Sequence, residues 1–159
     1  MQISPLQLST FWIGKVVIEP AVQAFVPGGQ ITIETVPTFR RNNDNPHQWF
    51  VELRVSFRSA NQQNVAYEGS VEMTGVFVAG GDLPEEKQIQ VIAVNAPSIL
   101  YSSVREFVAM LTAHGPHGKF VLPSVSFIDQ NLLPPNLETQ EAESDSKTGP
   151  MAREQHQRR

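Results

Sequence analysis

The sequence contains no cysteine. This absence excludes disulfide bonds, thiolate zinc sites and cysteine nucleophiles together, and it fits a reducing compartment. Positive charge is also scarce, because 12 lysine and arginine residues stand against 16 aspartate and glutamate residues and leave a net charge of −4. A nucleic-acid platform needs a concentrated positive face, so the composition argues against one.

Long hydrophobic runs and catalytic motifs are missing as well. No apolar stretch approaches the roughly 20 residues that a membrane helix needs, and the first residues lack the basic start and apolar core of a secretory signal. The sequence has no GxSxG nucleophile elbow, no P-loop and no GxGxxG fingerprint. We therefore expect a cytoplasmic protein that does not insert into membranes, has no enzymatic activity and uses no cofactor.

Two histidines, His114 and His117, form an HxxH pair in a loop bracketed by glycines. A zinc site would need further ligands close by, and the sequence offers none beside the pair. We interpret both histidines as solvated loop side chains and predict no metal site.

Alternation of apolar and polar residues is the strongest pattern that is present. Residues 49–58 and 67–77 each alternate with a period of two, and the short polar connection between them predicts an antiparallel hairpin. Residues 11–19 and 31–40 are two further strand candidates. Pro37 interrupts the second of these, and because proline cannot donate to a ladder, that strand is either bulged there or lies at a sheet edge.

Helical spacing of apolar residues follows at 88–96 and 98–113. Pro97 stands between these segments and predicts either one kinked helix or a second helix that opens there. Strands followed by helices are typical of an α+β domain, so we predict a four-stranded antiparallel sheet with two helices on one face over residues 1–135. Residues 136–159 are poor in large apolar side chains, and we predict that they form a disordered polar tail.

Several large apolar residues do not fit inside such a core. Phe50 falls on the polar face of its strand, and the neighbours Phe11 and Trp12 cannot share a face. Residues 120–122 are consecutive and apolar in an extended segment, so at least one of them points away from the core. Two interpretations stay open: a second subunit or the helices cover these side chains, or they form a groove that grips non-native chains.

The order of several short motifs along the chain carries a resemblance. They are Gly75-Val76-Phe77, Pro97-Ser98-Ile99-Leu100-Tyr101, Arg105-Glu106, the Gly115 break and Leu122-Pro123-Ser124-Val125-Ser126-Phe127. In this order and spacing the chain resembles the SecB family of export chaperones over residues 3–133. Its start, Ile3-Ser4-Pro5-Leu6-Gln7-Leu8, is similar to SecB-like proteins outside the best-known group.

The resemblance implies a fold and an activity. The fold is a four-stranded antiparallel sheet with a long helix, a crossover loop at residues 115–127 and a second helix, assembled as a homotetramer that is a dimer of dimers. The activity is ATP-independent holding of unfolded client proteins in apolar grooves, in many members for delivery to the SecA motor. The implied client-binding residues are Trp12, Phe25, Phe50, Phe120, Leu122 and Leu133. The implied oligomer interface is Val104, Phe107 and Leu111, for which ordinary core packing is an equal alternative.

The chain also departs from the family pattern. The SecA-docking surface of the best-known members is acidic, and Lys15 and Ser70 fall where acidic residues stand in those members, while Glu19 keeps its charge. Complementary charge guides docking, so we doubt that SecA binds. Pro134-Pro135 interrupts the place of the final helix. The relatives include chaperones dedicated to the antitoxin of a toxin–antitoxin system, so the partner is either a range of unfolded clients or one antitoxin. A scaffold for a single fixed partner is a further alternative.

Overall fold

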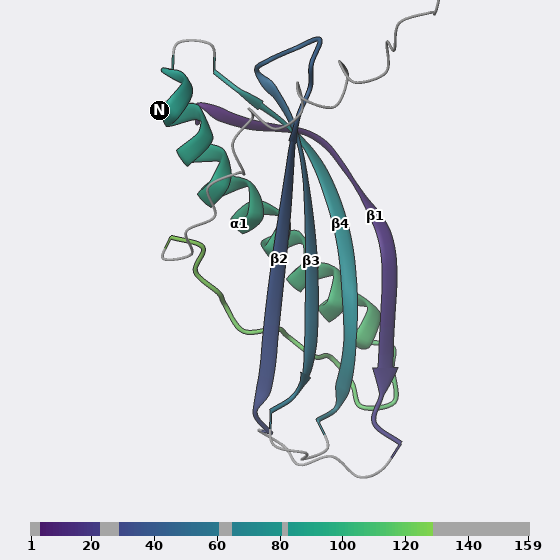
Figure 1. The fold of residues 1–159 in the computed structure, drawn as a ribbon. Coiled ribbons are helices and arrows are strands. Elements are labelled where there is room, and N and C mark those ends of the chain that lie inside the picture. Colours follow the sequence, from purple (N-terminus) through teal and green to yellow (C-terminus); the bar gives the residue numbers. More distant parts are fainter. Residues whose placement is uncertain (1–3, 23–28, 61–64, 81–82, 129–159) are drawn as a thin grey trace, which may run out of the picture.

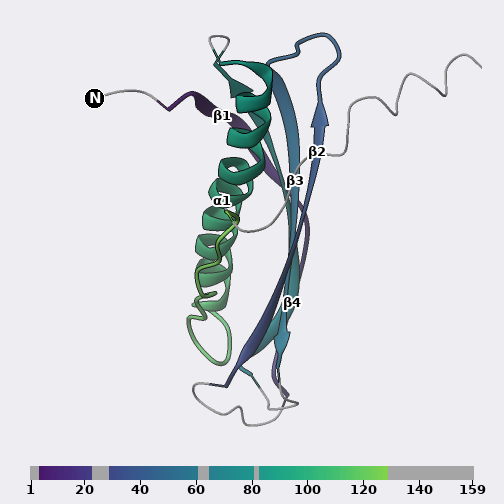
Figure 2. The ribbon, with the colours of Figure 1, turned by 60° about the vertical axis from the view of Figure 1, so that its left-hand side comes forward.

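The computed structural model describes residues 4–22, 29–60, 65–80 and 83–128. The elements are β1 (Leu6–Pro20), β2 (Ile31–Arg41), β3 (Gln48–Ser59), β4 (Tyr67–Ala79) and α1 (Glu85–Thr112). The strands form one antiparallel sheet in the order β1-β4-β3-β2. The helix crosses one face of this sheet, and among the described residues no helix lies on the other face (Figures 1 and 2). We call these the helix face and the outer face. The four-stranded α+β fold is confirmed, but the described residues contain one helix where the sequence predicted two.

The helix α1 continues through Pro97 instead of ending there. Pro97 is buried, and Ala93, Ala96 and Leu100 around it belong to the packed side of the helix. The hydroxyl of Ser98 donates to the backbone carbonyl of Val94 at 2.7 Å, beside the proline ring. A proline inside a helix costs about 3 kcal/mol, and here the apolar burial on both sides of it compensates. Of the two alternatives that the sequence left open at Pro97, one helix that continues through the proline is correct and a second helix that opens there is wrong.

The strands β3 and β4 supply the centre of the core. Their alternation is confirmed, because every second side chain of β3 packs beneath α1 and the intervening ones stand on the outer face. The buried members of β3 are Trp49, Val51, Leu53, Val55 and Phe57. On β4 the predicted apolar positions Tyr67, Val71, Met73 and Phe77 are also buried.

The two edge strands differ in their regularity. β2 pairs with β3 in an unbroken register from Ile31 to Arg41, so Pro37 lies on an edge strand without a bulge. β1 is longer than residues 11–19, and its register shifts twice, between Leu8 and Thr10 and between Ile13 and Lys15. Each shift inserts one extra residue into β1, which is the pattern of a β-bulge.

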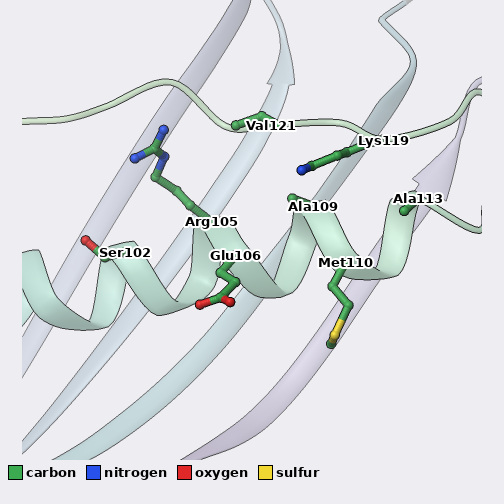
Figure 3. Close-up of a pocket in the computed structure, with 8 residues that line it drawn as sticks. All are labelled: Ser102, Arg105, Glu106, Ala109, Met110, Ala113, Lys119 and Val121. Atoms are coloured by element: carbon green, nitrogen blue, oxygen red, sulfur yellow. The ribbon is translucent and has the colours of Figure 1, made fainter.

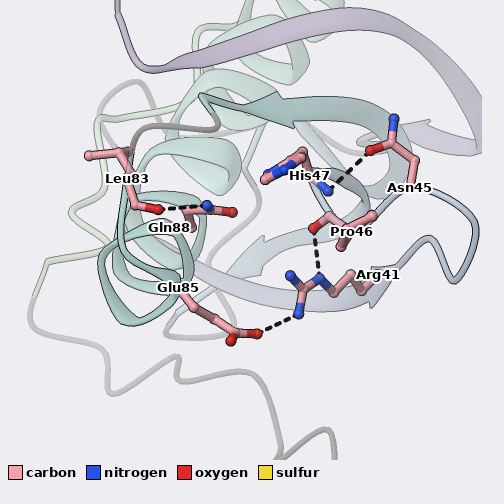
Figure 4. A network of polar contacts seen from close by, with 7 residues as sticks. All are labelled: Arg41, Asn45, Pro46, His47, Leu83, Glu85 and Gln88. Carbon is pink, nitrogen blue, oxygen red and sulfur yellow. Dashed lines mark hydrogen bonds and ion pairs between the residues drawn. The ribbon is translucent and has the colours of Figure 1, made fainter.

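A polar network holds the start of α1 to the connection between β2 and β3 (Figure 4). The Arg41 guanidinium pairs with the Glu85 carboxylate at 2.5 Å and also donates to the carbonyl of Pro46 at 2.7 Å. At the same end, the Gln88 side chain donates to the carbonyl of Leu83 at 2.7 Å. These contacts fix the N-terminal end of the helix over the β2–β3 side of the sheet. Within the described residues, no helix has the length and apolarity to cross a membrane.

Candidate functional site

Residues 118–128 form an extended segment that runs back along α1, and we call it the strap (Figure 1). Side chains of the helix hold its backbone. The Tyr101 hydroxyl donates to the carbonyl of Pro123 at 2.6 Å, and Arg105 Nε donates to the carbonyl of Leu122 at 2.8 Å. The backbone N–H of Phe120 donates to Thr112 Oγ1 at 2.9 Å. Burial raises the pKa of the Tyr101 hydroxyl, and the positive charge of Arg105 lowers it by a smaller amount.

The loop before the strap is structural and not merely solvated. His117 is half-buried, its ring nitrogen Nε2 lies 2.8 Å from the carbonyl oxygen of Ala21, and its backbone N–H donates to the Tyr67 hydroxyl at 3.1 Å. The Tyr67 ring meets the imidazole edge-on at a centroid distance of 5.7 Å. The prediction of a solvated side chain is therefore wrong for His117, which ties the loop to the end of β1, whereas His114 is exposed.

Three consecutive apolar residues of the strap have three different environments. Leu122 has no exposed surface and belongs to the core, so it cannot be part of an open client surface of this chain. Phe120 is half-buried, with ring centroids 5.9 Å from those of both Phe57 and Tyr67. Val121 is 52% exposed. The expectation that at least one of the three points outward is confirmed, and the outward residue is Val121.

The predicted oligomer-interface residues Val104, Phe107 and Leu111 on α1 also differ in how far they are buried. Val104 is fully buried against the sheet, so for this residue ordinary core packing is correct within the chain. Phe107 is half-buried and packs against the core, and Leu111 is 43% exposed. Of these three residues, Leu111 has the largest exposed fraction and is the residue best placed to contact a second molecule. Phe25 and Leu133 lie outside the described residues.

A hollow of about 510 Å³ lies on the solvent side of α1, beside the strap (Figure 3). Figure 3 shows Arg105 pointing from the helix toward the strap and Lys119 reaching back over the helix, while Glu106 and Met110 point away from the strap. Its lining residues are Ser102, Arg105, Glu106, Ala109, Met110, Ala113, Lys119 and Val121. This hollow was not predicted from the sequence. The residues that could have indicated it are Ser102, Met110 and Ala113, which lie on the exposed side of α1.

A second hollow, of about 290 Å³, lies on the outer face, and we call it the outer trough. Its lining residues are Trp12, Thr38, Arg40, Phe50, Glu52 and Thr74. Trp12 is 47% exposed, Phe50 is half-buried, and the Arg40 guanidinium lies 5.3 Å from the centroid of the Phe50 ring. The structure therefore brings two of the sequence-predicted residues, Trp12 and Phe50, into one site.

The β1 edge exposes apolar side chains on the helix face. Phe11 pairs with Gly75 and Val16 pairs with Val71, which places both on the side that α1 covers elsewhere. Phe11 is nevertheless 48% exposed, because the sheet extends beyond the helix at this edge. Trp12, opposite Thr74, is on the outer face, so the prediction that Phe11 and Trp12 point to opposite faces is confirmed.

Several charges on the rest of the outer face are paired across strands, whereas Glu19 of β1 lies opposite another acidic residue, Glu68 of β4. Arg54 of β3 pairs with Glu72 of β4 at 2.9 Å, and Arg58 pairs with Glu34 of β2 at 3.0 Å. Lys15 lies directly opposite Glu72 on the other side of β4. Basic side chains therefore offset the acidic ones around Glu72 and Glu34, and the acidic pair Glu19 and Glu68 stands at the end of β1.

These features describe a surface that is rich in exposed apolar side chains. Apolar side chains are exposed on both faces of the sheet and on the strap, and the described residues contain no group of three or more histidine or acidic side chains that could hold a metal ion. A comparison with protein families identifies the chain more directly. The model described as "Preprotein translocase subunit SecB" matches residues 18–131, which is more than half of the chain. The chain belongs to the SecB family of chaperones, which are non-enzymatic.

A solved structure shares this fold. A Mycobacterium tuberculosis SecB-like chaperone, Rv1957, in complex with a ChAD peptide from the Rv1956 HigA1 antitoxin, superposes with a TM-score of 0.60 at 19% identity, over 77% of this chain and 91% of that one. A Streptococcus agalactiae protein of unknown function gives a TM-score of 0.45 at 9% identity, over 75% of this chain and 97% of that one. No curated protein matches the chain.

Proposed function

We propose that this protein is an ATP-independent holdase that binds unfolded polypeptide segments on exposed apolar surfaces. The observation that carries the proposal is the set of large apolar side chains that remain exposed on the strap and the outer face of a folded SecB-family domain, including Trp12 and Val121. Hydrophobic association is non-directional and scales with contact area, so such a surface binds many sequences. Trp12, Phe50 and the exposed part of Phe120 are the proposed client contacts. Family membership supports the cytoplasm as its location.

The same surfaces support assembly into a homotetramer. β1 is a free edge strand with exposed Phe11 and Val16 on its helix face, and α1 adds the exposed Leu111. A second copy that covers these side chains would remove them from water and leave the strap and the outer face for clients. The α1 surface around Phe107 and Leu111 is therefore the proposed contact between copies.

An aggregation assay tests the holdase activity. A denatured client such as citrate synthase is diluted into buffer with and without equimolar protein, and light scattering is followed over time. We expect suppression for several unrelated clients without ATP. Suppression that needs ATP, or no suppression for any client, would contradict the proposal. Saturable binding of one partner without protection of generic clients would indicate the single-partner scaffold.

A dedicated antitoxin chaperone is the second candidate function. It is favoured by the likeness to a SecB-like chaperone whose solved structure contains an antitoxin peptide. Such a protein should be encoded beside a toxin–antitoxin pair and should protect that antitoxin from proteolysis. Rescue of the neighbouring antitoxin with weak protection of generic clients would favour this function over the general holdase. SecA docking is not part of the proposal, because Arg54, Arg58 and Lys15 offset the acidic charge of Glu72 and Glu34 on the outer face.

A further inference from the structure

The outer trough has a definite shape that follows from the strand register. Trp12 on β1 and Glu52 on β3 both lie opposite Thr74 of β4, and in the next row Phe50 lies opposite Val76. Large side chains on β1 and β3 therefore flank a floor of short side chains on β4. Two strand spacings separate the flanking backbones, about 9.5 Å, which is room for one ring or one branched side chain between them.

No described element covers this trough. The helix and the strap both lie on the opposite side of the sheet (Figure 2). Trp12 is a large aromatic side chain and is still half exposed, which leaves its ring free to make an apolar contact. Phe50 forms the wall of the trough on the β3 side, and its cation–π contact with Arg40 helps to fix the position of its ring.

The charges of the trough decide which occupant it suits. It contains one cation, Arg40, and one anion, Glu52, and the face beyond it carries the Arg54–Glu72 pair. A basic partner would meet Arg40 and Arg54 beside Glu52, and an acidic partner would meet Glu52, so neither gains from long-range attraction. An uncharged segment is the electrostatic complement of this surface.

We propose that the outer trough binds a short extended stretch of uncharged polypeptide along β4 and takes one aromatic or branched aliphatic side chain between Trp12 and Phe50. This inference rests on the proposed holdase function and defines a client chemistry for one site. It makes the outer face a client-binding surface in its own right, separate from the helix side of the molecule.

Intrinsic fluorescence can report this binding directly. The chain has two tryptophans, and Trp49 is only 1% exposed, so an emission change on peptide addition comes from Trp12. The probes are three peptides of equal length with one central phenylalanine, flanked by serine and alanine, by lysine, or by glutamate. We expect the uncharged peptide to shift the emission to shorter wavelength at lower concentration than the lysine and glutamate peptides do.

Two matched substitutions on β4 test the position. Thr74→Arg fills the floor of the trough, whereas Ser70→Arg places the same side chain on the same face of the same strand, opposite Val17 and Ser56. Thr74→Arg should weaken binding of the uncharged peptide by about tenfold or more, and Ser70→Arg should leave it unchanged. Circular dichroism spectra that match the wild type establish that both variants fold.

The outcomes separate this inference from the holdase proposal. Equal peptide affinity for Thr74→Arg and wild type overturns the inference, as does preferential binding of the lysine peptide, which would indicate a basic docking domain. Loss of peptide binding in Thr74→Arg alone supports the inference. If the wild type fails to suppress aggregation of any client but still binds the uncharged peptide through Trp12, the holdase proposal fails and the trough assignment stands.

Discussion

At the scale of single residues, Tyr101 shows how α1 stabilises the strap. Side chains of the helix supply hydrogen bonds to the strap backbone that a neighbouring strand would supply in a sheet. The Tyr101 hydroxyl donates to the Pro123 carbonyl, and Arg105 donates to the adjacent Leu122 carbonyl. Buried backbone groups need a partner, and an extended segment outside the sheet must find it in side chains. Burial also raises the pKa of Tyr101 above its ordinary value of 10.0.

Replacing Tyr101 with phenylalanine removes this hydrogen bond. We expect Tyr101→Phe to lower the free energy of unfolding by about 0.5–1.5 kcal/mol at neutral pH, measured by urea denaturation. The folded state holds the phenol proton more tightly than the unfolded state, so this contribution is complete below about pH 10 and is lost as the pH rises through the raised folded-state pKa of Tyr101. The difference between the two proteins should therefore shrink above about pH 10. A constant difference across that range would contradict the assignment.

Gly69 of β4 lies where the backbone of β1 leaves no room for a Cβ atom. A Cβ atom at this position would meet the backbone carbonyl of Val17 and lie 3.0 Å from Cα of Ile18. Because those atoms belong to a backbone, Gly69→Ala must push the two strands apart, and we expect a loss of about 1–3 kcal/mol in urea denaturation. Gly14→Ala is the matched control, since its Cβ would make only ordinary contacts, 3.8 Å or more away. Equal stability of the two variants would show that the strands adjust without strain.

At the scale of elements, the sequence predicted the regular parts and missed those that packing decides. The strands β3 and β4 were predictable because one face of each is fully buried and the alternation is complete. The first part of β1 was not, because two bulges interrupt the period of two. The continuity of α1 through Pro97 depends on burial on both sides of the proline, which no local pattern contains. For the same reason an apolar run could not reveal that Leu122 is buried and Val121 is exposed.

Pro37 protects one edge of the sheet. Ala60 donates to the carbonyl of Gln30, and Asn42 donates to the carbonyl of Gln48, so even-numbered residues of β2 direct their backbone groups toward β3. The odd-numbered residues, Pro37 included, face the free edge, where the proline removes a donor from the middle of the row.

Pro37→Thr restores this donor. We expect little change in the free energy of unfolding, within about 1 kcal/mol, together with a clear increase in self-association during concentration, measured by light scattering. Val36→Thr is the control, because the backbone of Val36 already faces β3. If both variants associate equally, the missing edge donor is not what limits pairing at β2.

At the scale of the whole molecule, the apolar surface is distributed unevenly. The helix α1 covers the centre of the sheet and its strap covers part of the β2–β3 side, whereas the β1 edge keeps exposed apolar residues on the helix face. The C-terminal half of α1 runs toward this edge (Figure 1). A domain of this size with one uncovered edge strand and adjacent exposed apolar side chains is well suited to pair with a copy of itself.

Leu111→Asp tests this assembly without entering the core of the chain. Leu111 is largely exposed, so an aspartate there is hydrated in the isolated domain and costs little, but it would be desolvated at a contact between copies. We expect the largest species in sedimentation velocity to dissociate to smaller ones at micromolar concentration, with an unchanged circular dichroism spectrum. Phe107→Asp should act in the same direction but also destabilise the domain, because Phe107 packs against the core. Val36→Asp, at an exposed valine of the outer face, is the control and should leave assembly intact. A Leu111→Asp protein that sediments as the wild type does would place the contact between copies elsewhere than on α1.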